Sequence, residues 1–98
     1  MARSKNLNEL LILSIKKPKE AKAYFNAVLE ECKSCDEQEA QKLLLLALKN
    51  IAEAQGGISQ LAVKTGLGRE SLYKTLSATG NPKLSTLISV TYALLSER

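Results

Sequence analysis

Apolar residues recur every three or four positions along most of this 98-residue chain, which is the spacing of one face of an α-helix. This spacing predicts a short first helix over residues 8–16. A longer helix is predicted to begin at Pro18, because proline lacks the N–H group that the first helical turn leaves unpaired. The apolar stripe of this second helix consists of Ala21, Tyr24, Phe25, Val28, Leu29 and Cys32.

A third helix is predicted to begin after Asp36. Asp36 is a favoured N-cap residue, and Glu39 follows three positions later as in a capping box. Residues 43–52 of this helix are apolar around much of its circumference, which favours a position at the centre of the core. The pair Gly56 and Gly57 is expected to end it.

The pattern changes to short helices after Gly57. Helices are predicted over residues 58–65 and 69–76, with Gly66 between them and a loop over residues 78–82. A last helix is expected from Leu84 to the C-terminus. Its core stripe is predicted to contain Leu84, Leu87, Ile88, Thr91 and Leu95. Val90 and Leu94 widen the apolar face and are the predicted surface for a second copy of the chain.

Together these segments predict an all-α protein with two parts. Residues 1–17 form an N-terminal helical segment, and residues 18–98 form a single helical domain that contains the helical pair at 58–76. The N-terminal helix carries an apolar stripe of Leu7, Leu10 and Leu11. This stripe either covers the core or binds a partner protein, and the pattern alone leaves both readings open.

The balance of charge changes the picture in the C-terminal half. The whole chain has a net charge of +4. Residues 1–55 carry nine Lys or Arg against eight Asp or Glu, whereas residues 56–98 carry five against two. A basic region with few acids is suited to a polyanion such as nucleic acid.

Composition also argues against several classes of protein. The chain has no histidine and no predicted strand with a glycine-rich phosphate loop, so we expect no enzyme, no cofactor and no metal site. Cys32 and Cys35 have metal-binding spacing, but a structural zinc site needs four ligands. No apolar run approaches the ~18 residues of a membrane helix, and no signal peptide is evident, so we expect a cytoplasmic protein without a membrane partner.

Residues 58–76 have the pattern of two helices that cross steeply. Ala62 is small where the second helix must approach, and Gly66 suits a turn with a left-handed backbone. The apolar contacts that hold the pair are predicted at Leu61, Leu67, Leu72 and Leu76. A helix-turn-helix places the outward residues of its second helix in the major groove of DNA. The predicted DNA-binding residues are Arg69, Glu70, Ser71, Tyr73, Lys74 and Lys83.

The chain resembles bacterial addiction-module antidote proteins, which are antitoxins of the HigA-like group with a Cro/repressor-type helix-turn-helix. The segments that match the family are EAKAYFNAVLE at 20–30, ALKNIAEAQGG at 47–57, LAVKTGL at 61–67, RESLYKTLS at 69–77 and GNPKLSTL at 80–87. They fall in the family's order, and the resemblance covers about residues 8–95. The sequence departs from the family pattern at Gly68. The family usually has Ser or Asn as the N-cap of the second helix of the pair, which is the helix that reads DNA (the reading helix) and is predicted here at residues 69–76.

This resemblance implies a fold, partners and a function. The fold is a five-helix lambda-repressor-like helix-turn-helix domain with an N-terminal helical extension. The partners are double-stranded operator DNA, a second copy in a homodimer, and a RelE-like (HigB-type) messenger-RNA ribonuclease toxin. The function is that of an antitoxin that represses its own operon. Two alternatives remain at this point: a solitary or prophage Cro/repressor-type regulator without a toxin, and an interaction module whose helical pair only packs.

Overall fold

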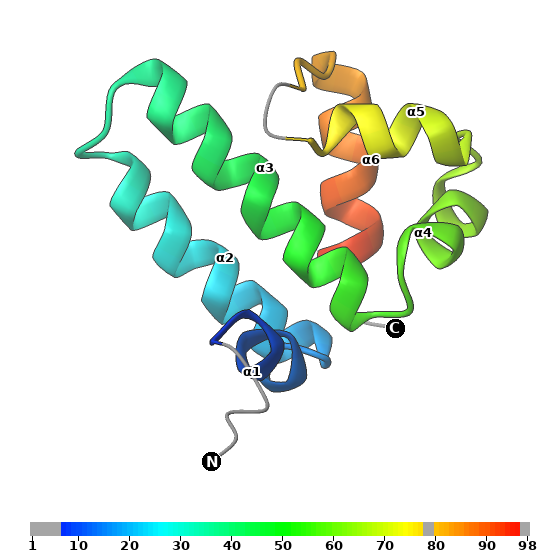
Figure 1. Cartoon of the computed structure of the whole chain (residues 1–98), viewed down its shortest axis with the longest axis horizontal. Coiled ribbons are helices and arrows are strands. Elements are labelled where there is room, and N and C mark those ends of the chain that lie inside the picture. The colour runs from blue at the N-terminus through cyan, green and yellow to red at the C-terminus, as the bar shows by residue number, and fades with distance from the viewer. Residues whose placement is uncertain (1–6, 78–79, 97–98) are drawn as a thin grey trace.

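The computed structural model describes residues 7–77 and 80–96. Within these residues it contains six helices and no strand, so the all-α prediction is confirmed (Figure 1). The helices are α1 (Leu7–Ser14), α2 (Pro18–Cys32), α3 (Glu37–Ala54), α4 (Ile58–Thr65), α5 (Arg69–Thr75) and α6 (Leu84–Leu95). Each predicted helix is present, and most of the predicted ends lie within two residues of the observed ones.

Local chemistry explains where the two long helices begin and end. Pro18 occupies the first turn of α2, as predicted. The N–H of Glu39 donates to Oδ1 of Asp36 over 2.8 Å, so Asp36 caps α3 as predicted. At the other end, Gly56 and Gly57 have φ values of 109° and 90°. Residues other than glycine rarely adopt such positive φ values. These two glycines turn the chain from α3 into α4.

Helix α3 is the centre of the core, as its apolar pattern predicts. It packs against α1, α2, α4 and α6, and Figure 1 shows it running through the middle of the molecule. Leu45, Leu48 and Ile51 are among its fully buried side chains. One polar residue shares this environment: Asn50 is buried, and its Nδ2 donates to the hydroxyl of Tyr24 on α2 over 3.3 Å.

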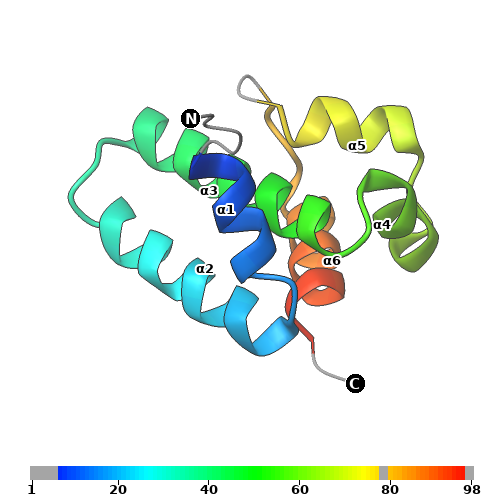
Figure 2. The ribbon, with the colours of Figure 1, turned by 60° about the horizontal axis from the view of Figure 1, so that its bottom comes forward.

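The N-terminal helix α1 lies across α3 (Figure 2). Leu11 and Ile12 pack against the core, and Ile15 just beyond the helix is buried. Leu10 and Leu13 each keep half of their surface exposed, and the side chain of Leu7 lies outside the described residues. The helix therefore covers the core with Leu11 and Ile12, while Leu10 and Leu13 stay half exposed.

Two predictions about the faces of α6 are wrong. Val90 and Leu94, the predicted surface for a second copy, are fully buried in the core, with exposed fractions of 0% and 2%. Leu84 and Ile88, predicted to face the core, are 72% and 60% exposed. The reason is that α6 carries no charged residue, so its apolar pattern runs all round the helix and does not select one face. Its neighbours α2, α3 and α4 make that selection.

The chain between α5 and α6 is non-helical at residues 80–82, in agreement with the predicted loop. The last helix ends at Leu95, where Ser96 has an extended backbone, so the prediction that it continues to the C-terminus is wrong at this residue. Positions 78–79 of the loop and residues 97–98 lie outside the described residues. In the part of the chain that the structure describes, no helix is both long and apolar enough to cross a membrane.

Candidate nucleic-acid interface

Helices α4 and α5 are joined by a three-residue turn that begins at Gly66. Gly66 is left-handed, with φ of 77°, and its N–H donates to the carbonyl oxygen of Ala62 over 2.8 Å. The hydroxyl of Thr65 also takes part. It donates to the carbonyl oxygen of Leu61 over 2.8 Å and accepts from the N–H of Leu67 over 3.2 Å. The turn thus satisfies its own polar groups and holds the direction in which α5 begins.

The predicted apolar contacts hold this pair onto the rest of the molecule. Leu61, Leu72 and Leu76 have exposed fractions of 2% or less, and Leu67 packs against the same core. Leu72 is the only residue within α5 that is buried. A seven-residue helix is therefore anchored by its middle and its end, and most of its remaining side chains are free to face solvent.

All five predicted site residues of α5 lie at the surface. Arg69, Glu70, Ser71, Tyr73 and Lys74 are exposed, and a shallow concavity of about 690 Å³ is lined by the first four of these together with Gly68. None of the charged side chains forms an ion pair with a described residue. Helix α5 lies at the edge of the molecule, away from α1 and α2 (Figures 1 and 2).

Lys74 belongs to a second, smaller concavity that sequence reasoning did not predict. It has a volume of about 370 Å³, and the loop after α5 contributes to it. Its lining residues are Lys74, Thr75, Ser77, Gly80 and Asn81. A Cβ atom placed on Gly80 would collide with the carbonyl oxygens of Lys74 and Thr75. Only glycine permits this approach of the loop to the end of α5, and the Gly-Asn-Pro turn was the one signal of it in the sequence.

The sixth predicted residue, Lys83, stands apart from the other five. It is the N-cap residue of α6, it is exposed, and its side chain forms no capping hydrogen bond. It follows Asn81 by two residues, so the loop connects it to the concavity that contains Lys74. Nε2 of Gln41 on α3 donates to the carbonyl oxygen of Gly80 over 2.8 Å and ties this loop to the core.

Comparison with known proteins identifies the family. A family model described as "Probable addiction module antidote protein" matches residues 12–97. The chain belongs to this family. An uncharacterized protein of Haemophilus influenzae is 41% identical over 75 residues, which cover 76% of this chain and 69% of that relative. No solved structure matches the chain. Membership in an antidote family implies a toxin partner of some kind.

The two cysteines of this antidote protein lie where α2 ends. Cys32 is in the last turn of α2, and Cys35 is in the loop before α3, as predicted. Both are free thiols that are partly buried. Burial raises the pKa of the Cys35 thiol above its ordinary value, and the nearby carboxylates, Glu39 first among them, raise that pKa further. No group of three or more potential metal ligands occurs among the described residues.

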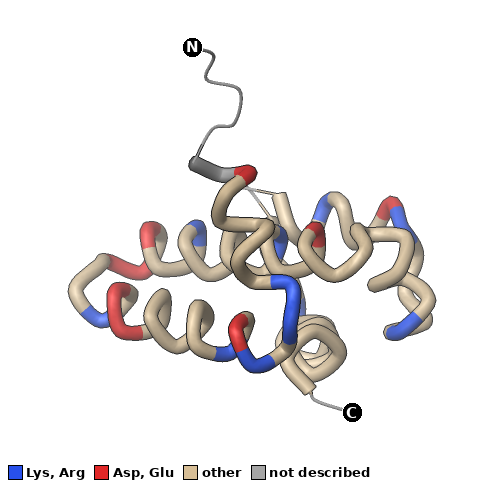
Figure 3. The backbone as a smooth tube through the Cα atoms, turned by 90° about the horizontal axis from the view of Figure 1, so that it is seen from below, with Lys and Arg blue, Asp and Glu red and all other residues tan. Residues whose placement is uncertain are grey.

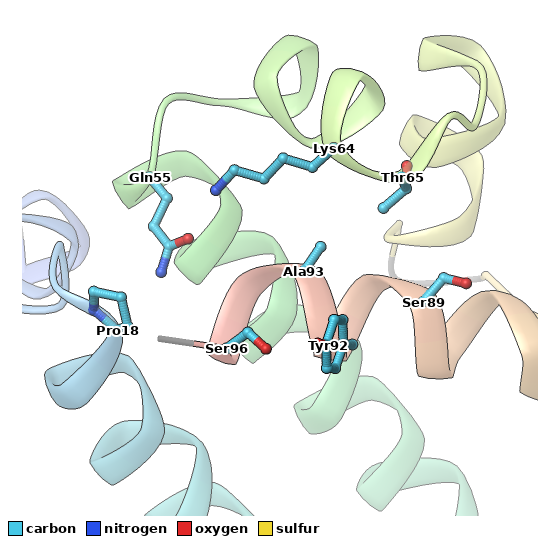
Figure 4. Close-up of a pocket in the computed structure, with 8 residues that line it drawn as sticks. All are labelled: Pro18, Gln55, Lys64, Thr65, Ser89, Tyr92, Ala93 and Ser96. Atoms are coloured by element: carbon cyan, nitrogen blue, oxygen red, sulfur yellow. The ribbon is translucent and has the colours of Figure 1, made fainter. Parts of the chain in front are cut away.

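A further concavity of this antidote protein, about 860 Å³, lies on another face (Figure 4). It is bordered by the start of α2 and by α4 and α6. Lys64 extends across it toward Gln55, whose Nε2 donates to the carbonyl oxygen of Leu94 over 2.9 Å. Lys64 is the one charged residue among those that line the concavity. Thr65, Ser89, Tyr92 and Ser96 also line this concavity, so its surface is mixed in polarity.

Proposed function

We propose that this antidote protein is a sequence-specific DNA-binding regulator that represses its own operon and neutralises a partner toxin. In this proposal residues 18–98 form the lambda-repressor-like domain, and α4 and α5 are its helix-turn-helix. The observation that carries it is the outward face of α5, where Arg69, Tyr73 and Lys74 are exposed and unpaired among the described residues. A helix anchored by its inner face and basic on its outer face is suited to the major groove.

Each residue of this face has a proposed role. Arg69 is the first residue of α5, and its guanidinium can donate two hydrogen bonds to one guanine edge. Lys74 and Tyr73 contact bases or phosphates further along the groove. Glu70 repels phosphate, so it acts in specificity by accepting from cytosine or by orienting Arg69. Ser71 makes a lesser contact.

Lys83 is proposed to hold a phosphate. It precedes the first turn of α6, where the unpaired backbone N–H groups of a helix favour an anion. Phosphate contacts carry no direct sequence information. Replacing Lys83 with Ala should therefore weaken binding to all DNA sequences about equally and lower the salt dependence of binding by about one unit of slope.

A homodimer is the proposed DNA-binding form, because one reading helix contacts few bases and discriminates weakly. The exposed apolar residues of α6 support an interface different from the one expected from the sequence. Leu84, Ile88 and Tyr92 follow each other at intervals of four residues and therefore lie on one face of α6. Their exposed fractions are 72%, 60% and 74%. Because α6 has no charged side chain, two copies can meet there without opposing like charges.

The dimer is tested by measuring mass in solution and on DNA. Ile88→Glu should give monomers and lose operator affinity, whereas Leu46→Glu, at a half-exposed leucine of α3, should leave both unchanged. On the operator, the two reading helices are expected about 34 Å apart, one turn of DNA. A complex of one chain with one non-repeated site would contradict the homodimer.

The proposed toxin is a RelE-like (HigB-type) ribonuclease encoded beside this chain, and the proposed compartment is the cytoplasm. The chain itself is proposed to have no catalytic activity and no cofactor. Growth of cells that express the neighbouring gene alone, or together with this chain, tests the toxin. A neighbouring gene that is harmless in both cases would favour a solitary or prophage regulator.

DNA reading is tested with single alanine variants on the DNA upstream of the gene and on a scrambled duplex of equal length. Arg69→Ala should lose about 1–3 kcal/mol of discrimination between the two duplexes, the worth of one bidentate base contact. Lys74→Ala should weaken binding to the upstream DNA. Fluorescence anisotropy at a stated salt concentration measures both affinities.

The matched control is Lys22→Ala, which removes an exposed cation from α2, far from α5. Circular dichroism verifies that every variant is folded. Unchanged upstream affinity in both Arg69→Ala and Lys74→Ala would contradict the assignment of α5 as the reading helix. If Lys22→Ala lost as much affinity for the upstream DNA as Arg69→Ala and Lys74→Ala, the losses would be explained by net charge alone.

A further inference from the structure

A mainly apolar groove lies between the α2–α3 hairpin and the segment that leads into α6. Its volume is about 270 Å³. Leu29 and Cys32 of α2 line one side, Leu44 of α3 lines the floor, and Pro82 and Leu87 line the other side. Leu29 is 42% exposed although it belongs to the apolar stripe of α2. No residue of α5 lines the groove, although the groove shares Asn81 with the concavity that contains Lys74.

Carboxylates gather where α2 ends and α3 begins, next in sequence to the groove residues Cys32 and Ala40, although none of them lines the groove itself. Residues 30–39 contain five exposed carboxylates: Glu30, Glu31, Asp36, Glu37 and Glu39. Between residues 30 and 42 the only cations are Lys33 and Lys42, and Lys33 is already engaged with Glu30 at 3.5 Å. Figure 3 shows these acids together at the end of the molecule away from α4 and α5.

The walls of the groove are held by hydrogen bonds across the elements that form it. Sγ of Cys32 on α2 donates to the carbonyl oxygen of Ala40 on α3 over 3.6 Å. Gln41 on α3 donates to the carbonyl oxygen of Gly80 in the loop before α6. Because three separate segments are linked in this way, the groove exists before a partner binds, which lowers the cost of binding.

We propose that this groove, together with the acidic turn between α2 and α3, is the docking site for the toxin, and that its occupant is a segment of the toxin with apolar side chains flanked by Lys or Arg. The groove takes the apolar side chains, and the carboxylates attract the flanking cations. This inference rests on the toxin-binding part of the proposed function and is independent of DNA binding.

The charges select this occupant among the alternatives. Two copies of the chain that met at this groove would bring their carboxylates together, so the surface does not suit a symmetric dimer. The same carboxylates repel the phosphates of DNA. A basic partner gains from both features of the surface, and an antidote protein requires a toxin partner.

The test uses the full-length chain and the toxin encoded in its operon, both purified. In the first variant, Glu31→Lys and Glu39→Lys are combined. This variant should bind the toxin about 100-fold more weakly or worse, because two attractive contacts become repulsive. The matched control combines Glu20→Lys and Glu53→Lys, which make the same charge change at exposed positions of α2 and α3 away from the turn between these helices. The control should bind within about threefold of the parent, since distant exposed charges are screened.

A second pair of variants tests the apolar part of the site. Leu29→Asp should weaken toxin binding and the rescue of growth, and Leu46→Asp, at an exposed leucine of α3 that does not line the groove, should leave both unchanged. Equal binding by the parent and the Glu31/Glu39 variant would overturn the proposal. So would an operon whose other product does not bind this chain.

The same four variants are measured on operator DNA, which separates this proposal from DNA reading. We expect the parent affinity for DNA in the two groove variants, because the groove lies off the outward face of α5. If the parent chain itself does not bind DNA, while the Glu31/Glu39 variant loses the toxin, the DNA proposal fails and the docking site stands.

Discussion

The α2–α3 hairpin and the α4–α5–α6 region are built on different principles. Helix α3 has 18 residues, of which seven are buried, whereas α5 has seven residues, of which one is buried. A long helix spreads its contacts with the core over several turns, and a short helix depends on one or two anchors. Most side chains of α5 are therefore available for recognition, while changes in α3 act on stability first.

The charges of the two regions differ in the same way. The hairpin carries five of its seven carboxylates at or near the turn between α2 and α3, whereas the outward face of α5 carries Arg69 and Lys74 with one acid, Glu70. Figure 3 shows a group of acids at the end of the molecule opposite to α4 and α5, with further single acids elsewhere. One small domain thus presents two surfaces that attract opposite partners. This separation allows each surface to be altered without the other.

The comparison predicts that the largest loss of stability comes from α3. Leu48→Ala should lower the free energy of unfolding by about 2–5 kcal/mol, because Leu48 is fully buried and the substitution leaves a cavity. Leu46→Ala, two residues away but half exposed, should cost less than about 1 kcal/mol. Urea unfolding followed by circular dichroism measures both. Similar losses in the two variants would contradict α3 as the centre of the core.

A smaller effect is expected where the loop meets the end of α5. Gly80→Ala should cost about 1–3 kcal/mol, because a Cβ atom there meets backbone oxygens that cannot move independently of α5. It should also weaken DNA binding. Gly68→Ser is the comparison, since nothing lies within 4 Å of a Cβ atom at Gly68 and serine caps a helix slightly better. Gly68→Ser should raise the free energy of unfolding by a few tenths of a kcal/mol. Thermal unfolding of both variants measures the two changes in stability.

The helix cap in the hairpin should contribute less again. Asp36→Ala should lower stability by about 1 kcal/mol, since the N–H of Glu39 loses its partner. Asp36→Asn keeps an oxygen acceptor and should remain within a few tenths of a kcal/mol of the parent. Neither variant should change DNA affinity. A change in DNA affinity with either one would show that the two regions are coupled.

The smallest effect concerns the reactivity of Cys35. Its raised pKa leaves less thiolate at pH 8 than a free cysteine has, so alkylation by iodoacetamide should be slower at that pH and should speed up as the pH rises. Glu39→Gln removes one cause of the shift and should increase the rate at pH 8. Mass spectrometry of the Cys32→Ser variant, in which Cys35 is the remaining thiol, measures the rate at which Cys35 is alkylated. Equal rates with and without Glu39 would remove that carboxylate as a cause.

The double change of Cys32 and Cys35 to Ser should leave DNA binding intact, because the thiols lie in the hairpin and not near α5.

The candidate site was predictable in its central part and not at its border. The five predicted residues of α5 follow Gly66 at a spacing that places them outward once Leu72 is buried, and the structure has these five at the surface. The contribution of Gly80 and Asn81 was not predictable, because it depends on how the loop returns to the end of α5. Likewise, the contact of Gln41 with Gly80 joins positions 39 residues apart, which no local pattern encodes.

The sequence by itself determined where the helices begin and end. Pro18, Asp36, Gly57 and Gly66 act through bonds and dihedral angles within a few residues, so their effects are local and can be recognised in the sequence. Only the tertiary structure decided which faces are buried. Helix α6 has no charged residue to mark a solvent side, and packing against α2, α3 and α4 buries Val90 and leaves Ile88 exposed. When apolar residues surround a helix, its neighbours and not its periodicity select the face that meets the core.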